Sequence, residues 1–210
     1  PYWPLIPGVL RAAGAVPVEV PVSQAMATGS LELAAVLDAH RTARTRAVYF
    51  ISPNNPDGVG WSEAAVSTLA DYAQRHDLWV LADEVYADYV YEGSHHHVAD
   101  LPGMAARTIS TFSLSKSHGV AGARIGYAVA APEVIAACRR ISNHTVYNLP
   151  ESMQRVALAA VRHGDGWIAE AKAAYRAARD ACVAGLDEAG LRHSGAQGGS
   201  FVFADLRPQL

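Results

Sequence analysis

The stretch "RTISTFSLSKSHGVAGARIGY", residues 107–127, places a lysine just beyond the end of an apolar run. Thr108–Ser113 has the composition of a β-strand, and Lys116 follows it before a turn with two glycines. Arg124 then comes immediately before another apolar run. Burying a lysine at the mouth of a sheet is costly unless another group uses its charge. We therefore expect Lys116 to be buried and to have a chemical function.

The composition is that of a soluble globular protein. The chain has 210 residues, of which 50% are apolar and 18% charged, so it is long enough to bury a substantial core. A formal net charge of -3 without long charged runs favours neither nucleic acid nor an anionic membrane as a partner. No apolar run reaches the ~18 to 20 residues that span a bilayer, and the N-terminus does not resemble a signal peptide.

Two cysteines, Cys138 and Cys182, lie in helix-like stretches without CxxC spacing. This pattern predicts buried thiols in a reducing compartment. We therefore expect a cytoplasmic protein.

Apolar runs alternate with amphipathic segments along the chain, which is typical of a layered α/β domain. Strands are predicted at residues 16–22, 47–52, 78–83, 108–113 and 124–129.

Helices are predicted between these strands. Ser62 is expected to cap a helix that runs to about Gln74, Ser30 to cap a second, and Pro132 to begin a third. Residues 150–190 have apolar side chains at spacings of three or four and predict one long helix that bridges two domains. The closing "GGSFVFADL" predicts a strand of a second, smaller domain.

Polar residues follow three of the predicted strands, each at the carboxyl end. "AVYFIS" runs into Pro53-Asn54-Asn55-Pro56-Asp57-Gly58, "LWVLA" into Asp83-Glu84 with Tyr86 beyond, and "TISTF" into Ser113 with Lys116 beyond. The carboxyl ends of parallel strands lie along one edge of a sheet, where α/β folds bind ligands. We therefore expect these side chains to converge in one crevice.

The motifs "SPNNPDG", "DEVY" and "SLSKSHGVAGARIGY" occur in that order, with "PYW" at the front. Together they resemble fold-type I enzymes that depend on pyridoxal 5'-phosphate (PLP), in the aspartate aminotransferase superfamily of classes I and II. The resemblance implies a three-layer α/β/α large domain with a mostly parallel sheet over residues 1–175. Residues 176–210 would begin a smaller α+β domain.

The resemblance also implies roles for the residues at the crevice. Lys116 would form the Schiff base with the PLP aldehyde and then move a proton from the substrate α-carbon. Asp83 would pair with the pyridine nitrogen and keep the ring protonated, so that the ring accepts electrons. Tyr86 and Asn55 would donate hydrogen bonds to the 3-oxygen of the ring.

The remaining roles concern the phosphate and the substrate. Ser113 and Arg124 would hold the phosphate, because a guanidinium matches its oxygens in geometry and charge. Trp3 matches an aromatic residue near the cofactor and substrate. Asp57 replaces the threonine of the usual NPTG motif and is interpreted as a variant turn. Family members carry a phosphate loop upstream of Pro1 and a substrate-binding arginine downstream of Leu210, so we expect the central part of a longer enzyme.

Simpler interpretations remain open for several of these residues. Asp83 is also suited to cap a helix, Arg124 to form a surface ion pair, and Trp3 to pack in the core. His118 is suited to packing or to a place near the cofactor. The segment that starts at Tyr147 resembles one that lies beside the partner subunit's active site.

The predicted function is transfer of an amino group from an L-amino acid to a 2-oxo acid by a PLP-dependent aminotransferase. The resemblance implies a homodimer acting on small molecules. The same scaffold supports C-S lyases and cyclases, and an aminotransferase-like sensor domain of a transcription regulator is a further alternative.

No metal site is predicted. The run His95-His96-His97 has no separated further ligand, and consecutive histidines are not expected to converge on one ion. A solvated loop is therefore predicted for this run.

Overall fold

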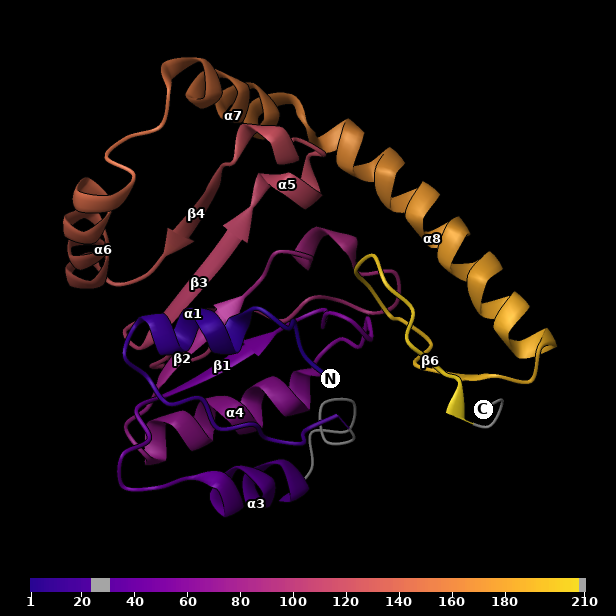
Figure 1. Cartoon of the computed structure of the whole chain (residues 1–210), viewed down its shortest axis with the longest axis horizontal. Helices are drawn as coiled ribbons and strands as arrows, with labels where there is room; N and C mark the ends of the chain where they lie inside the picture. The colour runs from indigo at the N-terminus through magenta and orange to yellow at the C-terminus, as the bar shows by residue number, and fades with distance from the viewer. Residues whose placement is uncertain (24–30, 208–210) are drawn as a thin grey trace.

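The computed structural model describes residues 1–23 and 31–207 and has an α/β fold built around a four-stranded sheet, in the order β1-β2-β3-β4 (Figure 1). The strands are β1 (Ala47–Ile51), β2 (Trp79–Asp83), β3 (Thr108–Ser113) and β4 (Gly126–Val129). The first three strands are parallel, whereas β4 is antiparallel to β3. The predicted α/β class and the mostly parallel sheet are confirmed.

The register of the sheet brings the ends of the first three strands together. Ile51 is paired with Asp83, and Asp83 is paired in turn with Thr111, two residues before the end of β3. The polar segments that follow β1, β2 and β3 therefore start from one edge of the sheet, as the sequence predicts.

Helices and short paired strands make up the remaining regular structure. They are α1 (Ile6–Ala12), α3 (Leu31–His40), α4 (Glu63–Arg75), η1 (Ala87–Tyr89), η2 (Val98–Asp100), α5 (Leu114–Ser117), η3 (Ala121–Ala123), α6 (Pro132–Thr145), α7 (Glu151–His163), α8 (Asp165–Glu188), β5 (Arg192–His193) and β6 (Ala204–Asp205).

The predicted starts of two helices are confirmed. The Ser62 hydroxyl accepts a hydrogen bond from the Ala65 backbone N–H at 3.2 Å and so caps α4, and Pro132 begins α6. The predicted cap Ser30 lies outside the described residues.

The hydrophobic core lies between one face of the sheet and the pair α3 and α4. Alternate strand residues such as Phe50, Val80 and Ala82 point into it and are at most 5% exposed, and Leu69 of α4 is fully buried. The opposite face of the sheet is less covered, since Asp83 is only half-buried. The sheet therefore has one closed face and one face that is only partly covered, which we call the open face.

The predicted strand at residues 16–22 is wrong. This segment has no strand in the structure, and Val16 and Val18 are 74% and 54% exposed. Pro17 and Pro21 lack the N–H groups that a sheet ladder needs, which outweighs the β-branched composition of the segment.

The single helix predicted for residues 150–190 is two helices, α7 and α8, which meet at Gly164. A Cβ at Gly164 would lie 2.4 Å from the Ala160 carbonyl oxygen and 2.5 Å from a ring carbon of His118. The junction therefore packs too closely for a side chain, and the chain changes direction there. The domain boundary predicted at residue 175 falls within α8 and stays a prediction.

The closing strand is shorter than predicted. Only β6 (Ala204–Asp205) has strand geometry, and it pairs with β5 in a separate two-stranded sheet. Residues 198–203 instead make an isolated bridge at Gly198 and otherwise run as irregular chain.

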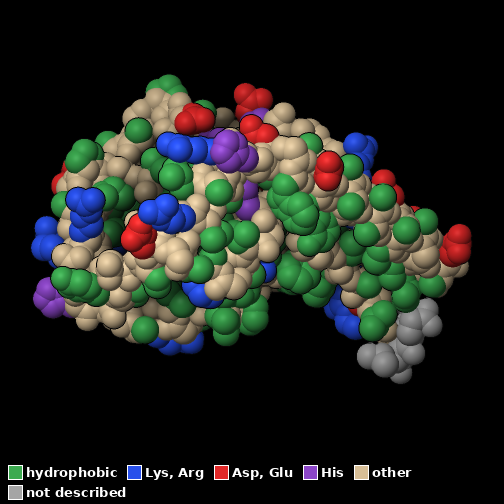
Figure 2. All heavy atoms as spheres, turned by 90° about the horizontal axis from the view of Figure 1, so that it is seen from above, with side chains coloured by type: hydrophobic (Ala, Val, Ile, Leu, Met, Phe, Trp, Pro, Cys, Tyr) green, Lys and Arg blue, Asp and Glu red, His purple; other side chains and the backbone are tan. Residues whose placement is uncertain are grey.

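The prediction that both cysteines are buried is wrong. Cys138 in α6 and Cys182 in α8 are exposed free thiols, because α6, α7 and α8 contain no buried residue. Figure 2, which looks at the molecule from the side of α7, shows hydrophobic side chains at the surface among charged ones. Over residues 1–23 and 31–207, no helix has both the length and the apolar content to cross a bilayer.

Replacing Leu69 with alanine tests the core. Because Leu69 is fully buried, the substitution should lower the free energy of unfolding by about 2–5 kcal/mol, measured by urea denaturation. Asp71→Ala on the exposed side of the same helix should change it by no more than about 0.5 kcal/mol. Equal losses in the two variants would contradict the assignment of this core.

Candidate active site

The turn after β1 is held by a buried pair of polar side chains. The Asn54 amide donates to an Asp57 carboxylate oxygen at 2.8 Å, and the Val59 backbone N–H donates to the same oxygen at 3.1 Å. Asn54 and Asp57 are only 5% and 4% exposed. Asp57, the departure from the family motif, is therefore a structural element of this turn.

A segment from the far end of the chain rests on this turn. Gly198 donates its N–H to the Gly58 carbonyl oxygen at 3.0 Å, and the Gln197 side chain accepts from the Gly60 N–H at 2.9 Å. On its other side the segment joins the chain after η1, where Gly199 donates to the Tyr89 carbonyl oxygen at 2.8 Å. The segment 196–201 therefore links the turn after β1 with the chain beyond β2.

Asp83, at the end of β2, is fixed by two hydrogen bonds. The Tyr49 hydroxyl donates to one carboxylate oxygen at 2.9 Å, and the Val85 backbone N–H donates to the other at 3.3 Å. Burial raises the pKa of Asp83, and the hydrogen bond from Tyr49 opposes this rise. The carboxylate is thus held in one orientation on the open face of the sheet.

Tyr86 and Asn55 lie beside this carboxylate. Tyr86 is 3% exposed; burial and the charge of Asp83 raise the pKa of its hydroxyl, and the Asn55 side chain lowers it through a hydrogen bond. Phe201 of the C-terminal segment packs edge-on against the Tyr86 ring, with 6.3 Å between centroids. The structure therefore brings Asn55, Asp83 and Tyr86 together, as predicted.

Lys116 lies in α5, directly after β3. Its carbonyl oxygen, together with that of Ser117, accepts a hydrogen bond from the Tyr89 hydroxyl at 3.0 Å, so the backbone of α5 is fixed. The side chain is exposed, and the prediction of a buried lysine is wrong. The physical reason is that Lys116 stands at the open edge of the sheet, where the described residues do not enclose it.

Ser113 and Arg124 lie on either side of the α5 start. Ser113 caps α5 by accepting from the Ser115 N–H at 3.2 Å, and the neighbouring Leu114 N–H bonds to the Ile125 carbonyl oxygen at 3.1 Å. Arg124 is therefore adjacent to this cap. It has a left-handed backbone with a φ of 55°, and its exposed guanidinium donates to the Ala121 carbonyl oxygen at 3.2 Å.

Trp3 belongs to the N-terminal segment, which contacts the turn after β1 through Pro1. The Asn54 amide donates to the Pro1 carbonyl oxygen at 3.3 Å, which anchors this segment on the turn after β1. Trp3 is half-buried, and its carbonyl oxygen accepts from the Ile6 N–H at the start of α1.

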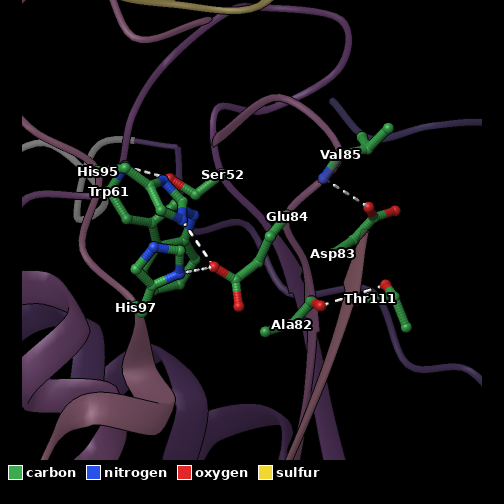
Figure 3. A network of polar contacts seen from close by, with 9 residues as sticks. All are labelled: Ser52, Trp61, Ala82, Asp83, Glu84, Val85, His95, His97 and Thr111. Atoms are coloured by element: carbon green, nitrogen blue, oxygen red, sulfur yellow. Dashed lines mark hydrogen bonds and ion pairs between the residues drawn. The ribbon is translucent and has the colours of Figure 1, made fainter. Parts of the chain in front are cut away.

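The histidine run corrects a prediction. His95 and His97 both bond through a ring nitrogen to the same Glu84 carboxylate oxygen, so they do converge, and the His95 side chain is only 8% exposed (Figure 3). Burial raises the pKa of Glu84, but the hydrogen bonds from His95 and His97 help to outweigh it, and the pKa is held at about 2. The prediction of a solvated loop therefore fails for His95.

Asp83 and Glu84 point to opposite sides of the chain at the end of β2 (Figure 3). A cavity of about 210 Å³ lies on the Glu84 side, and its lining includes Glu84, Ser113, Ser117 and His118. Among the predicted site residues, only Ser113 contributes to it. The cavity is therefore distinct from the group formed by Asn55, Asp83 and Tyr86.

Comparison with known proteins identifies the family. The sequence profile of the family described as aminotransferase class I and II matches residues 1–210. The chain belongs to this family. Members of the class I and II aminotransferase family use PLP.

The aminotransferase chain resembles individual relatives over nearly its whole length. It is 36% identical over 211 residues to arginine–pyruvate transaminase AruH of Pseudomonas aeruginosa, covering 99% of this chain and 53% of that protein. It is 35% identical over 218 residues to a probable aspartate/prephenate aminotransferase of Thermus aquaticus, covering 99% and 54%. Among solved structures, a double mutant of Thermus thermophilus aspartate aminotransferase has a TM-score of 0.89 at 29% identity, covering 99% and 54%. The chain thus spans about half the length of the relatives it matches.

The donor set of the candidate site fits PLP. The cofactor has a ring nitrogen, a phenolic oxygen, an aldehyde and a phosphate, and the site offers a carboxylate, a phenol with an amide, an amine, and a hydroxyl with a guanidinium. Asp83 in particular is a half-buried carboxylate oriented by two donors, which suits a partner that carries a proton on nitrogen.

Two features of the site are absent from the sequence prediction. Tyr49 is the hydrogen-bond donor to Asp83. Tyr49 lies two residues before Ile51, which is paired with Asp83, and alternate residues of a strand share one face. The strand pattern therefore indicated that Tyr49 and Asp83 lie on the same face. Glu84 with His95 and His97 was detectable from the i, i+2 spacing of the two histidines, since extended chain points such residues to one side.

Replacing Gly58 with alanine tests the contact between the turn and the C-terminal segment. Gly58 has a φ of +67°, and a Cβ there would lie 2.7 Å from the Ala196 Cβ and 2.8 Å from the Gly198 and Phe201 carbonyl oxygens. Gly14→Ala is the matched control, because Gly14 has a φ of +78° and open space around it. Backbone strain alone should lower the free energy of unfolding of this control by about 1–2 kcal/mol.

Gly58→Ala should lower the free energy of unfolding by about 1–3 kcal/mol more than the control, because the added methyl group also overpacks the turn. Hydrogen exchange should show the accompanying loss of protection at the Gly198 and Gly199 amides. If both variants lost the same free energy of unfolding, the segment 196–201 would not pack on this turn.

Proposed function

We propose that the protein is a PLP-dependent aminotransferase that transfers an amino group between an L-amino acid and a 2-oxo acid. The observation that supports this most directly is the Asp83 carboxylate, which Tyr49 and Val85 orient at the same sheet edge from which α5 and Lys116 begin. PLP supplies an aldehyde carbon that bonds to amines and a ring that accepts electron density from the substrate.

Asp83 would hold a proton on the ring nitrogen. Because Tyr49 and Val85 fix its two oxygens, the carboxylate would meet that nitrogen in one orientation. A fixed negative charge in a partly desolvated position favours the protonated nitrogen and needs no reorganisation during the reaction.

Lys116 would supply the amine that binds the cofactor and moves the proton. The Tyr89 hydroxyl holds the Lys116 backbone by its carbonyl oxygen, while the side chain is free to change position. This combination suits a group whose Nζ must bond to the cofactor and later accept a proton from the substrate α-carbon and deliver it elsewhere.

The other predicted residues would orient the cofactor. Tyr86 and Asn55 would donate to its phenolic oxygen, and their position next to Asp83 supports this role. Ser113 and Arg124 flank the start of α5 and would bind the phosphate there. Trp3 would contact the cofactor or substrate from the N-terminal segment.

The protein would act as a homodimer with small-molecule substrates, in the cytoplasm. Support for a partner comes from exposed apolar side chains on α6 and after it, including Ile141 at 67% and Tyr147 at 75% exposure. We also propose that residues 1–175 belong to the large PLP-binding domain and 176–210 to the small one.

Trapping the cofactor tests the role of Lys116. The purified protein incubated with equimolar PLP and reduced with borohydride should carry a stable adduct on Lys116, located by peptide mass mapping. Lys116→Ala should lose this adduct and the yellow absorbance of bound PLP. Lys172→Ala removes the other lysine of the chain and should retain both.

An adduct on Lys172 in preference to Lys116 would contradict the assignment, as would an unchanged absorbance band in the Lys116→Ala variant.

An amino-transfer assay tests the reaction. A screen of L-amino acid donors with a 2-oxo acid acceptor should give the donor's 2-oxo acid and the acceptor's amino acid in equal amounts. Asp83→Asn keeps the size of the side chain but removes its charge, and it should lower kcat by about 100-fold or more. Asp71→Asn, an exposed control, should leave kcat unchanged.

Products of elimination without amino-acid formation from the acceptor would instead indicate a lyase. Near-normal turnover of Asp83→Asn would refute the electronic role of this carboxylate.

A further inference from the structure

We propose that Glu84, His95 and His97 form a binding site for one divalent transition-metal ion, and that zinc is the ion that suits it best. The three residues have no role in the proposed amino transfer, since Asp83 and Glu84 point to opposite sides of the chain (Figure 3). The site is therefore an addition to the proposed function and does not depend on it.

The three ligand atoms already lie close together. Glu84 Oε2, His95 Nε2 and His97 Nδ1 all lie within 4.8 Å of one another, and the first two are 2.8 Å apart. An ion bound at 2.0–2.2 Å in tetrahedral geometry separates its ligand atoms by roughly 3.4 Å. Both imidazoles are closer to the Glu84 carboxylate than this, and the His97 contact is the shorter of the two, so both rings would have to move away from the carboxylate to make room for zinc.

The backbone explains why the two histidines converge. His97 is extended, with φ of -81° and ψ of 117°, and residues two apart in extended chain point to the same side. His96 lies between them and is not in the cluster. The loop that follows Tyr91 thus presents alternate imidazoles to Glu84, which stands at the end of β2.

Two polar atoms of the same three-residue cluster lack a hydrogen-bond partner. Glu84 Oε1 and His95 Nδ1 are buried and have no hydrogen-bond partner among residues 1–23 and 31–207. Buried polar atoms in native proteins are nearly always paired with protein, water or an ion, so such atoms need an explanation. In a metal site, Oε1 is available as a second carboxylate ligand.

The donor set selects the type of metal. Two imidazole nitrogens and one carboxylate are a known ligand set of zinc sites that keep an open position. Calcium and magnesium prefer sites made of oxygen atoms alone. The open position is accessible, because the His97 side chain is 39% exposed and the cavity of about 210 Å³ reaches Glu84.

A bound ion would link the loop after Tyr91 to the end of β2. The Glu84 side chain is only 3% exposed, and a bound cation would balance its negative charge and so offset the cost of burying it. Because such an ion would bind the folded chain in preference to the unfolded one, it would stabilise the fold by an amount that rises with the logarithm of the zinc concentration above Kd.

Zinc titration of untagged, chelator-treated protein tests the site. A chromophoric zinc chelator should report competition by one tight site per chain, and zinc should raise the Tm. His97→Asn retains a side-chain N–H that is able to bond to Glu84 but removes the metal-binding nitrogen, so it should weaken zinc binding by about 100-fold or more and abolish the Tm shift.

His96→Asn is the matched control in the same loop and should bind zinc like the unmodified protein. Cobalt should give the visible absorption of a tetrahedral complex in the unmodified protein and in His96→Asn, but not in His97→Asn. The proposal is overturned if the unmodified protein shows no tight zinc site, or if the His97→Asn variant binds zinc as tightly as the unmodified protein. In both cases Glu84 and the two histidines would be a hydrogen-bonded anchor for the loop.

Discussion

The parallel pairing of β1, β2 and β3 is the constraint on which the site depends. Asp83 is in register with Ile51 on one side and Thr111 on the other, so the chain leaves all three strands at the same edge. Residues from three distant parts of the sequence are adjacent for this reason alone. Shifting a strand by one residue would turn its side chains to the opposite face and separate Asp83 from Tyr49.

The same pairing divides the strand ends into two chemical environments. On one face, Tyr49, Asp83 and Tyr86 form a group that suits a cofactor ring, and the sheet is open there. On the other face, next to the closed core, the Glu84 carboxylate is hydrogen-bonded to two imidazoles. Because neighbouring residues of a strand point in opposite directions, Asp83 and Glu84 lie in different environments although they share a peptide bond.

The sequence was most informative where local pattern and burial agree. The parallel strands, the Ser62 cap and the grouping of Asn55, Asp83 and Tyr86 could be predicted, because each depends on apolar runs, capping chemistry or strand ends. The segment 16–22 could not, since its prolines compete with its valines. The exposure of Lys116 and the contact between His95 and Glu84 depend on how distant segments pack, which periodicity does not report. The roles of the site residues stay predictions.

The packing of residues 196–201 on the turn after β1 affects the order in which the protein folds. Gly60 and Gln197 are 137 positions apart, so closing this contact has an entropic cost, and the contact forms only after Gln197 has left the ribosome. The core of α3, α4 and the first strands is complete long before that. During synthesis the contact between this turn and residues 196–201 is therefore made late, on a core that is able to fold earlier.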